Sequence, residues 1–71
     1  METVKINTEY IKLDSFLKLA SLCMSGGEAK TVIGEGQVKV NGEVCTMRGK
    51  KLRGGDTVEF AGKKLTVCDE T

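Results

Sequence analysis

Five basic residues fall within residues 37–55 of this 71-residue chain, where a single acidic residue accompanies them. Their ammonium and guanidinium groups can neutralise phosphate oxygens, so the stretch has the chemistry to follow a nucleic-acid backbone. Five basic and one acidic residue give it a charge of +4, whereas six basic and nine acidic residues give the rest of the chain −3. The total of +1 therefore conceals a confined basic segment. Its basic residues are Lys39, Arg48, Lys50, Lys51 and Arg53.

A second candidate anion site is the segment Ser25-Gly26-Gly27-Glu28. If a helix begins here, its first backbone amides can donate to phosphate oxygens, beside the Ser25 hydroxyl and the Lys30 ammonium group. The other interpretation is structural: Ser25 only caps the helix, and the glycines only permit a tight turn between helices. Glu28 would also oppose an anion. The sequence leaves both interpretations open.

The chain lacks the residues that usually carry out catalysis. The chain has no His to act as a general base, no Ser or Cys in a recognisable nucleophile turn, and no phosphate-binding loop. Single carboxylates in so polar a chain are usually solvated. We therefore expect no enzymatic activity and no cofactor. The carboxylates considered are Asp14, Asp56 and Glu59.

The three cysteines, Cys23, Cys45 and Cys68, form no CxxC pair, and no His is present to complete a zinc site. We expect neither a metal site nor a disulfide, but buried or half-buried thiols of a reducing compartment. The sequence does not say whether one of them is reactive.

The length allows one domain, residues 1–71. No apolar run is long enough to span a bilayer, and the first ten residues lack the charged and apolar regions of a secretory signal. We therefore expect a cytoplasmic protein, and a monomer.

Two short helices are predicted before the basic segment. The first runs from Leu13 to about Cys23, because apolar residues recur at i, i+3, i+4 and i+7. The second follows Ser25, which forms a capping box with Glu28, whose carboxylate reaches back to the Ser25 amide. Two glycines weaken its end. The apolar stripes are Leu13, Phe16, Leu17 and Ala20, then Ala29, Val32 and Ile33; the glycines are Gly34 and Gly36.

The remaining residues alternate between apolar and polar, as strands do. The pair Asn41-Gly42 is the one most favoured in a type I′ hairpin turn, and Val44 continues the pattern beyond it. Residues 46–56 predict a charged loop that ends in a Gly-Gly-Asp turn. The alternating runs are residues 3–7, 37–40, 57–60 and 64–67.

Several short motifs follow one another along residues 11–60. They are Leu13-Asp14-x-Phe16-Leu17, Ser25-x-x-Glu28-Ala29-Lys30-x-x-Ile33, Gln37-Val38-x-Val40-Asn41-Gly42 and Gly55-Asp56-x-Val58. In combination they resemble the RNA-binding domain first recognised in small-subunit ribosomal protein S four. Further motifs are similar to small stand-alone bacterial proteins of the YaaA type: Phe16-Leu17-Lys18, Gly26-Gly27-x-Ala29-Lys30 and Arg48-Gly49-x-Lys51-Leu52.

The resemblance implies the alpha-L arrangement, an α+β fold in which two short helices pack on a small, mostly antiparallel sheet of about four to five strands. Structured RNA, often ribosomal, would bind across the second helix and the following hairpin. The implied RNA-facing residues are Lys12, Ser25, Lys30, Gln37, Lys39 and Asn41, with the basic loop residues Arg48, Lys50, Lys51 and Arg53 as a further contact.

Three positions depart from the family pattern. Lys12 stands where many members have Arg. Its ammonium group acts as a point charge, whereas a guanidinium group can form two parallel hydrogen bonds with a phosphate. Gly34 interrupts the second helix, and Met47 precedes Arg48 where relatives often have a second basic residue.

Aromatic residues that could stack on bases are nearly absent, because Phe16 and Phe60 are predicted to face the core and leave only Tyr10. Recognition is therefore expected to depend on the RNA backbone and shape. The expected function is a non-catalytic module that binds ribosomal or other folded RNA, in association with the ribosome. The alternative is a protein-interaction module that uses the sheet or its edge and carries the basic loop only for solubility.

Overall fold

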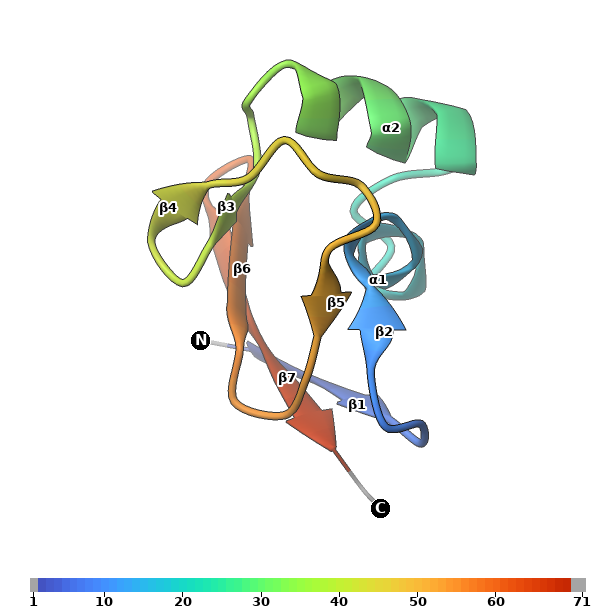
Figure 1. Ribbon diagram of the computed structural model, residues 1–71, viewed down its shortest axis with the longest axis vertical. Coiled ribbons are helices and arrows are strands. Elements are labelled where there is room, and N and C mark those ends of the chain that lie inside the picture. The colour runs from blue at the N-terminus through green and yellow to red at the C-terminus, as the bar shows by residue number, and fades with distance from the viewer. Residues whose placement is uncertain (1, 70–71) are drawn as a thin grey trace.

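The computed structural model describes residues 2–69, which fold into two sheets and two helices (Figure 1). Five strands form one sheet in the order β1-β7-β6-β3-β4, in which only β1 and β7 are parallel. The strands β2 and β5 form a separate antiparallel pair. The elements are β1 (Glu2–Ile6), β2 (Ile11–Lys12), α1 (Leu13–Leu19), α2 (Gly26–Gly34), β3 (Lys39–Val40), β4 (Glu43–Val44), β5 (Lys51–Leu52), β6 (Thr57–Phe60) and β7 (Lys63–Asp69).

Helix α1 ends earlier than the sequence predicts. Its apolar stripe is confirmed, since Leu13, Phe16 and Leu17 are fully buried. The helix stops at Leu19 because Ser21 adopts a left-handed φ of 61°, after which the Cys23 amide turns back to the Leu17 carbonyl at 3.2 Å. Neither helix within residues 2–69 has the length and apolar character to cross a membrane.

Helix α2 begins with the predicted cap. The Ser25 hydroxyl oxygen accepts the Glu28 amide at 3.2 Å. The Glu28 carboxylate reaches back one residue further than predicted, since it accepts the Met24 amide at 3.0 Å and not that of Ser25. The helix ends at Gly34, and Gly36 supplies the left-handed exit with a φ of 74°.

The hairpin between β3 and β4 is the one predicted. Asn41 and Gly42 have φ angles of 53° and 85°, so both central residues are left-handed, as a type I′ turn requires. Ala61 and Gly62 repeat the same signs in the turn between β6 and β7. The weak strand signal at residues 3–7 corresponds to β1.

The prediction of a loop over residues 46–56 is wrong at Lys51 and Leu52, which form β5. Ile11 lies across from Leu52 and Lys12 from Lys51. A two-residue strand is too short to show alternation, and its partner precedes both helices, so no local pattern reveals it. Leu52 is nevertheless fully buried.

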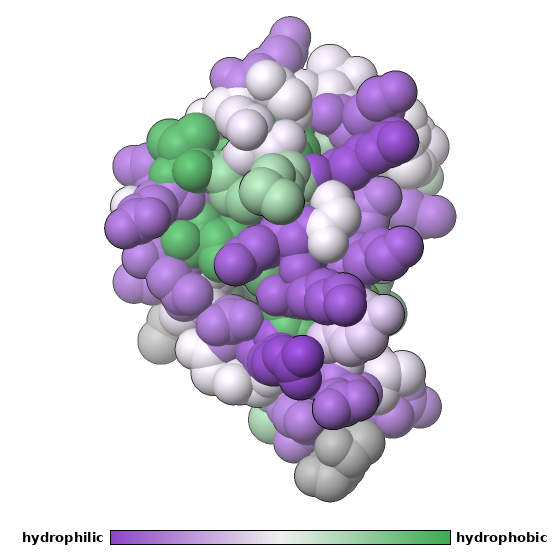
Figure 2. Space-filling model, in the orientation of Figure 1, coloured by the Kyte–Doolittle hydropathy of each residue, from purple (hydrophilic) through white to green (hydrophobic). Residues whose placement is uncertain are grey.

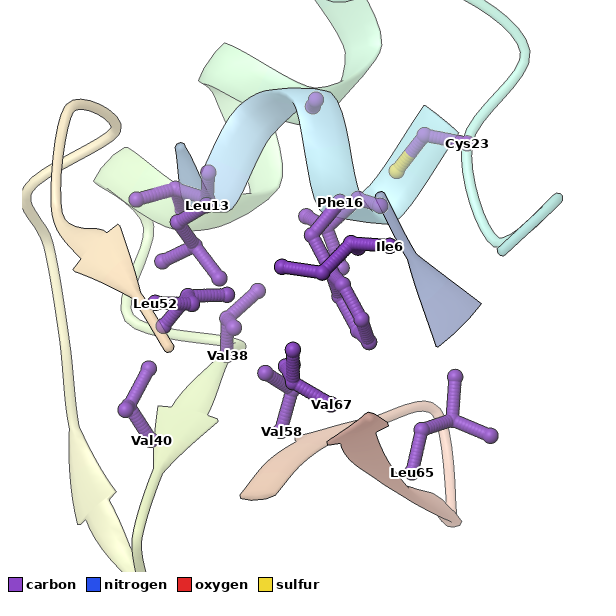
Figure 3. Packing of buried hydrophobic residues seen from close by; sticks show 13 residues of the cluster. Ile6, Leu13, Phe16, Cys23, Val38, Val40, Leu52, Val58, Leu65 and Val67 are labelled. Carbon is purple, nitrogen blue, oxygen red and sulfur yellow. The ribbon is translucent and has the colours of Figure 1, made fainter. Parts of the chain in front are cut away.

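One hydrophobic core fills the space between the helices and the sheet (Figure 3). Figure 3 shows Phe16 of α1 and Ile6 of β1 pointing toward Val58 and Val67 of the sheet, while Leu52 closes one side. Among residues 2–69 no polar or charged residue is buried. Every polar side chain of these residues is therefore at least partly exposed to solvent, including those on the outer side of β2 and β5.

Candidate nucleic-acid interface

Two lysines face each other on the outer side of the β2–β5 pair. Because Ile11 and Leu52 point into the core, their neighbours Lys12 and Lys51 point outward. The two lysines occupy directly opposed positions, where like charges destabilise a sheet. Within residues 2–69 neither forms an ion pair with a carboxylate. The pair therefore presents uncompensated positive charge to solvent.

The same side of this small sheet carries an arginine and a tyrosine. Continuing the antiparallel register places Tyr10 across from Arg53. The Lys51 ammonium nitrogen lies 4.9 Å from the centre of the Tyr10 ring, within the range of a cation–π contact. Glu9 approaches Arg53 with an N–O distance of 3.7 Å, but both side chains are exposed and such a pair contributes little.

Loop carbonyl groups cap helix α1 and bring two more basic residues to this place. The Leu13 amide donates to the Lys50 carbonyl at 2.9 Å, and the Asp14 amide donates to that of Arg48 at 3.2 Å. Lys12 occupies the N-cap position, but its side chain accepts no hydrogen bond from the helix. The loop carbonyls accept the first amides of the helix instead. The loop backbone is thereby fixed beside β2. We call the outer side of the β2–β5 pair the basic face; its basic residues are Lys12, Lys51 and Arg53, and the loop that carries Arg48 and Lys50 borders it.

Hydrophilic side chains cover the region in front of β2 and β5 in Figure 2, whereas apolar surface is visible on the side where Figure 1 places β4. The exposed apolar residues nearest in sequence are Val44 in β4 and Met47 in the following loop, which are 57% and 66% exposed. The basic face is thus bordered by an apolar patch.

Lys39 and Gln37 lie away from the basic face. Val40 points into the core, so Lys39 points to the outer side of the five-stranded sheet, where it lies across from Glu59. The Gln37 side-chain amide donates to the Glu35 carboxylate at 2.8 Å. The structure therefore separates these two predicted contacts from Lys12 and Lys51, and places carboxylates beside both.

Ser25 and Lys30 lie on α2, outside the β2–β5 pair. The Glu28 amide donates to the Ser25 hydroxyl oxygen, so this amide cannot donate to an anion as the hypothesis of a phosphate site assumed. Among residues 2–69 no acceptor is present for the amides of Gly26 and Gly27. Lys30 is exposed. The capping interpretation of Ser25 is supported directly, and its contact with RNA stays a prediction.

The Asn41 side chain forms hydrogen bonds within the fold that the sequence did not predict. Its side-chain carbonyl accepts the Thr57 amide at 2.9 Å, and its amide group donates to the Asp56 carboxylate at 3.2 Å. The other Asp56 oxygen accepts the Arg53 amide at 2.8 Å. The β3–β4 turn is thereby tied to the turn that follows β5. Asn41 is exposed, and a contact with RNA is again a prediction.

Tyr10 was recognised from the sequence as the one aromatic residue left for stacking, but it was not predicted to lie on the RNA-facing surface. Its spacing of two from Lys12 was the available signal, since alternate residues share one face of a strand. This spacing alone could not place Tyr10 beside the basic residues, because it is the pairing of β2 with β5 that brings Lys51 against the ring.

Cys23 is buried and Cys45 and Cys68 are half-buried, as predicted, and all three are free thiols. Burial, reinforced by the neighbouring Glu28 carboxylate, raises the pKa of the Cys23 thiol. In the part of the chain that the structure describes, no three His, Cys, Asp or Glu side chains gather as metal ligands would.

Comparison with known proteins identifies the family. Residues 4–68 match the S4 domain. A Bacillus subtilis (strain 168) protein named "Probable ribosome maturation protein RlbA" is 49% identical over 59 residues, which cover 83% of each chain. An Escherichia coli (strain K12) protein named "Putative RNA-binding protein YbcJ" is 45% identical over 58 residues, covering 82% of this chain and 83% of the relative.

The solution structure of YbcJ from E. coli, described as revealing an alpha-L motif involved in RNA binding, has the same fold. It matches with a TM-score of 0.73 and 40% identity, over 96% of this chain and 87% of the YbcJ chain. The predicted alpha-L arrangement of two helices on a mostly antiparallel sheet is thereby confirmed. On this fold and these sequence matches, the chain belongs to the S4 domain family.

Proposed function

We propose that this protein binds structured RNA through the basic face and catalyses no reaction. The observation that carries the proposal is the direct opposition of Lys12 and Lys51 with no carboxylate paired to either, among the residues described. Opposed like charges weaken a sheet, and a phosphate placed between them would turn this repulsion into attraction. Arg53 and the loop residues Arg48 and Lys50 extend the same charge, so several phosphates can be bound in sequence.

The RNA is proposed to be ribosomal or ribosome-associated, and the protein to act as a monomer. Support comes from the relatives, since one is named for ribosome maturation and another for RNA binding. The remaining predicted contacts, which lie outside the basic face, would be made only if the RNA extends over α2 or around the sheet edge. These are Ser25, Lys30, Gln37, Lys39 and Asn41.

A protein-interaction role has one observation in its favour. Val44 and Met47 are exposed, and they line a hollow of about 320 Å³ that Lys50 also borders. Strand β4 is at the end of the sheet order, so its edge is available for pairing. This role would be favoured if Met47→Gln removed association with ribosomes while binding to purified RNA stayed intact.

In-cell crosslinking, followed by sequencing of the attached RNA, tests the proposed function. Wild-type protein should recover ribosomal RNA at defined positions, and a variant with Lys12→Gln, Lys51→Gln and Arg53→Gln should recover much less. The matched control is Lys18→Gln, Lys63→Gln and Lys64→Gln, which removes the same number of charges outside the basic face. Equal RNA recovery by the triple variant and the control would contradict the proposal.

A further inference from the structure

We infer that Tyr10 forms a stacking site for one unpaired nucleobase of the RNA, whose neighbouring phosphates bind Lys12 and Lys51. This inference rests on the proposed function and makes it more specific. The RNA bound at the basic face then has a single-stranded nucleotide, such as a bulge or loop base, at this point.

The first observation is the exposure of the ring. Tyr10 is 36% exposed, whereas Phe16 is fully buried and Phe60 half-buried. The chain has one Tyr, two Phe and no Trp, so Tyr10 is its most accessible aromatic surface. An exposed ring beside a basic groove is the arrangement on which bases of single-stranded nucleic acids stack.

The second observation is the position of the ring among the phosphate-binding groups. Lys51 lies 4.9 Å from the ring centre, and Lys12 is on the same face of β2, two residues along. A base that stacks on Tyr10 therefore has its own phosphates within reach of both ammonium groups. Duplex RNA offers phosphates in the same way but keeps its bases stacked inside the helix.

The third observation is that contacts within the protein orient the Tyr10 side chain without a ligand. The Thr8 hydroxyl donates to the Tyr10 carbonyl at 2.8 Å, which holds the backbone just before β2. Lys51 holds the ring by the cation–π contact. The phenol oxygen has no hydrogen-bond partner among residues 2–69, so the exposed part of the side chain is not used by the fold.

A structural role is the competing explanation, in which Tyr10 only supports Lys51. The two explanations differ in what they predict for polyanions without bases. If Tyr10 only positions Lys51, its removal weakens binding to every polyanion alike. If Tyr10 stacks on a base, its removal weakens binding only to RNA with unpaired bases.

Three probes distinguish these outcomes: oligouridine of about 10 nucleotides, a blunt RNA duplex, and inorganic polyphosphate of matched charge. Tyr10→Leu should lose about five-fold or more in affinity for oligouridine, since one stacked base is worth at least that factor. Its affinity for the duplex and for polyphosphate should stay within about two-fold. Tyr10→Phe retains the ring and should bind all three probes as wild type does.

Proton NMR of the wild-type protein gives a second test that needs no variant. Because Tyr10 is the sole tyrosine, its ring resonances are unambiguous. Oligouridine should shift them upfield by the ring current of the stacked base, and polyphosphate should not. Equal losses for all probes in Tyr10→Leu, or no base-dependent shift, would overturn the stacking site. Failure of wild-type protein to bind any of the probes would instead contradict the proposed function.

Discussion

Lys12 lies directly across from Lys51 in a two-residue antiparallel pair, and neither lysine has a carboxylate partner among the residues described. Below the pair, Leu52 belongs to the hydrophobic core and the partly buried Ile11 packs against that core. Core packing therefore forces two like charges together. In a protein that binds phosphates this arrangement weakens the free protein slightly and strengthens the complex.

Lys12→Glu should move stability and RNA binding in opposite directions. The new carboxylate would lie across from Lys51 and at the N-terminus of α1, where a negative charge is favoured. We expect the free energy of unfolding to rise by about 0.5–1 kcal/mol in urea denaturation. RNA affinity, measured by fluorescence anisotropy, should fall about ten-fold or more.

The matched control is Lys18→Glu, which makes the same charge change in the last turn of the same helix. It should lower stability slightly, because a negative charge is unfavourable there, and should affect RNA affinity far less than Lys12→Glu. Parallel losses of RNA affinity in both variants would mean that only net charge matters.

Asn41→Gly should destabilise the fold by about 1–2 kcal/mol. The folded variant should keep its RNA affinity if the bound RNA does not extend beyond the basic face. Glycine retains the left-handed backbone at this turn but loses the hydrogen bonds to Asp56 and Thr57. A double-mutant cycle with Asp56→Ala should show positive coupling in the free energy of unfolding. If Asn41→Gly keeps wild-type stability but binds RNA poorly, the residue contacts RNA and its contacts within the fold are unimportant.

Gly54→Ala should be costly although its φ is not left-handed. A Cβ atom at Gly54 would lie 2.8 Å from the Cβ of Asp69, so the backbone of the turn or of β7 must shift. We expect a loss of about 1–3 kcal/mol in unfolding free energy. At Gly49 a Cβ would meet no atom within 4 Å, so Gly49→Ala is the control and should stay near the wild-type value. Equal stability of the two variants would refute the close approach.

The Cys23 thiol should make stability fall at alkaline pH. Its pKa is raised in the folded protein by burial and by Glu28, so the fold keeps a proton that the unfolded chain loses. The resulting stability is complete below the unfolded pKa of about 8.5 and is lost as the pH rises toward the folded pKa.

Wild-type protein should therefore lose more unfolding free energy than Cys23→Ala when the pH rises from about 8 to 10. Cys45→Ala removes a half-buried thiol and controls for the loss of a thiol as such. Parallel pH curves for wild type and Cys23→Ala would show that Cys23 titrates alike in both states.

The parts of the fold that depend on local signals were predictable from the sequence. The stripe containing Phe16, the cap at Ser25 and the turn at Asn41-Gly42 each follow from residues within one turn of each other. The pairing of β2 with β5 was not predictable, because each strand has only two residues and both helices lie between them in the chain.

The candidate site follows the same division. Lys51 and Arg53 were visible within a segment of excess positive charge, but their grouping with Lys12 depends on the β2–β5 pairing, whereas Lys39 lies on the outer side of the separate five-stranded sheet. The pairing also brings Tyr10 to the basic face. A side chain's partners across a sheet are set by register, which a single sequence specifies only weakly for such short strands.

The salt dependence of RNA binding shows directly whether Lys12 and Lys51 neutralise phosphates. If the basic face neutralises three to five phosphates, log affinity of the wild-type protein should fall with log salt at a slope of about −2 to −4. The double variant Lys12→Gln, Lys51→Gln should reduce the magnitude of this slope by about 2, whereas Lys63→Gln, Lys64→Gln should leave it unchanged. A slope that is the same in wild type and in the Lys12 and Lys51 double variant would show that these two lysines do not bind phosphates.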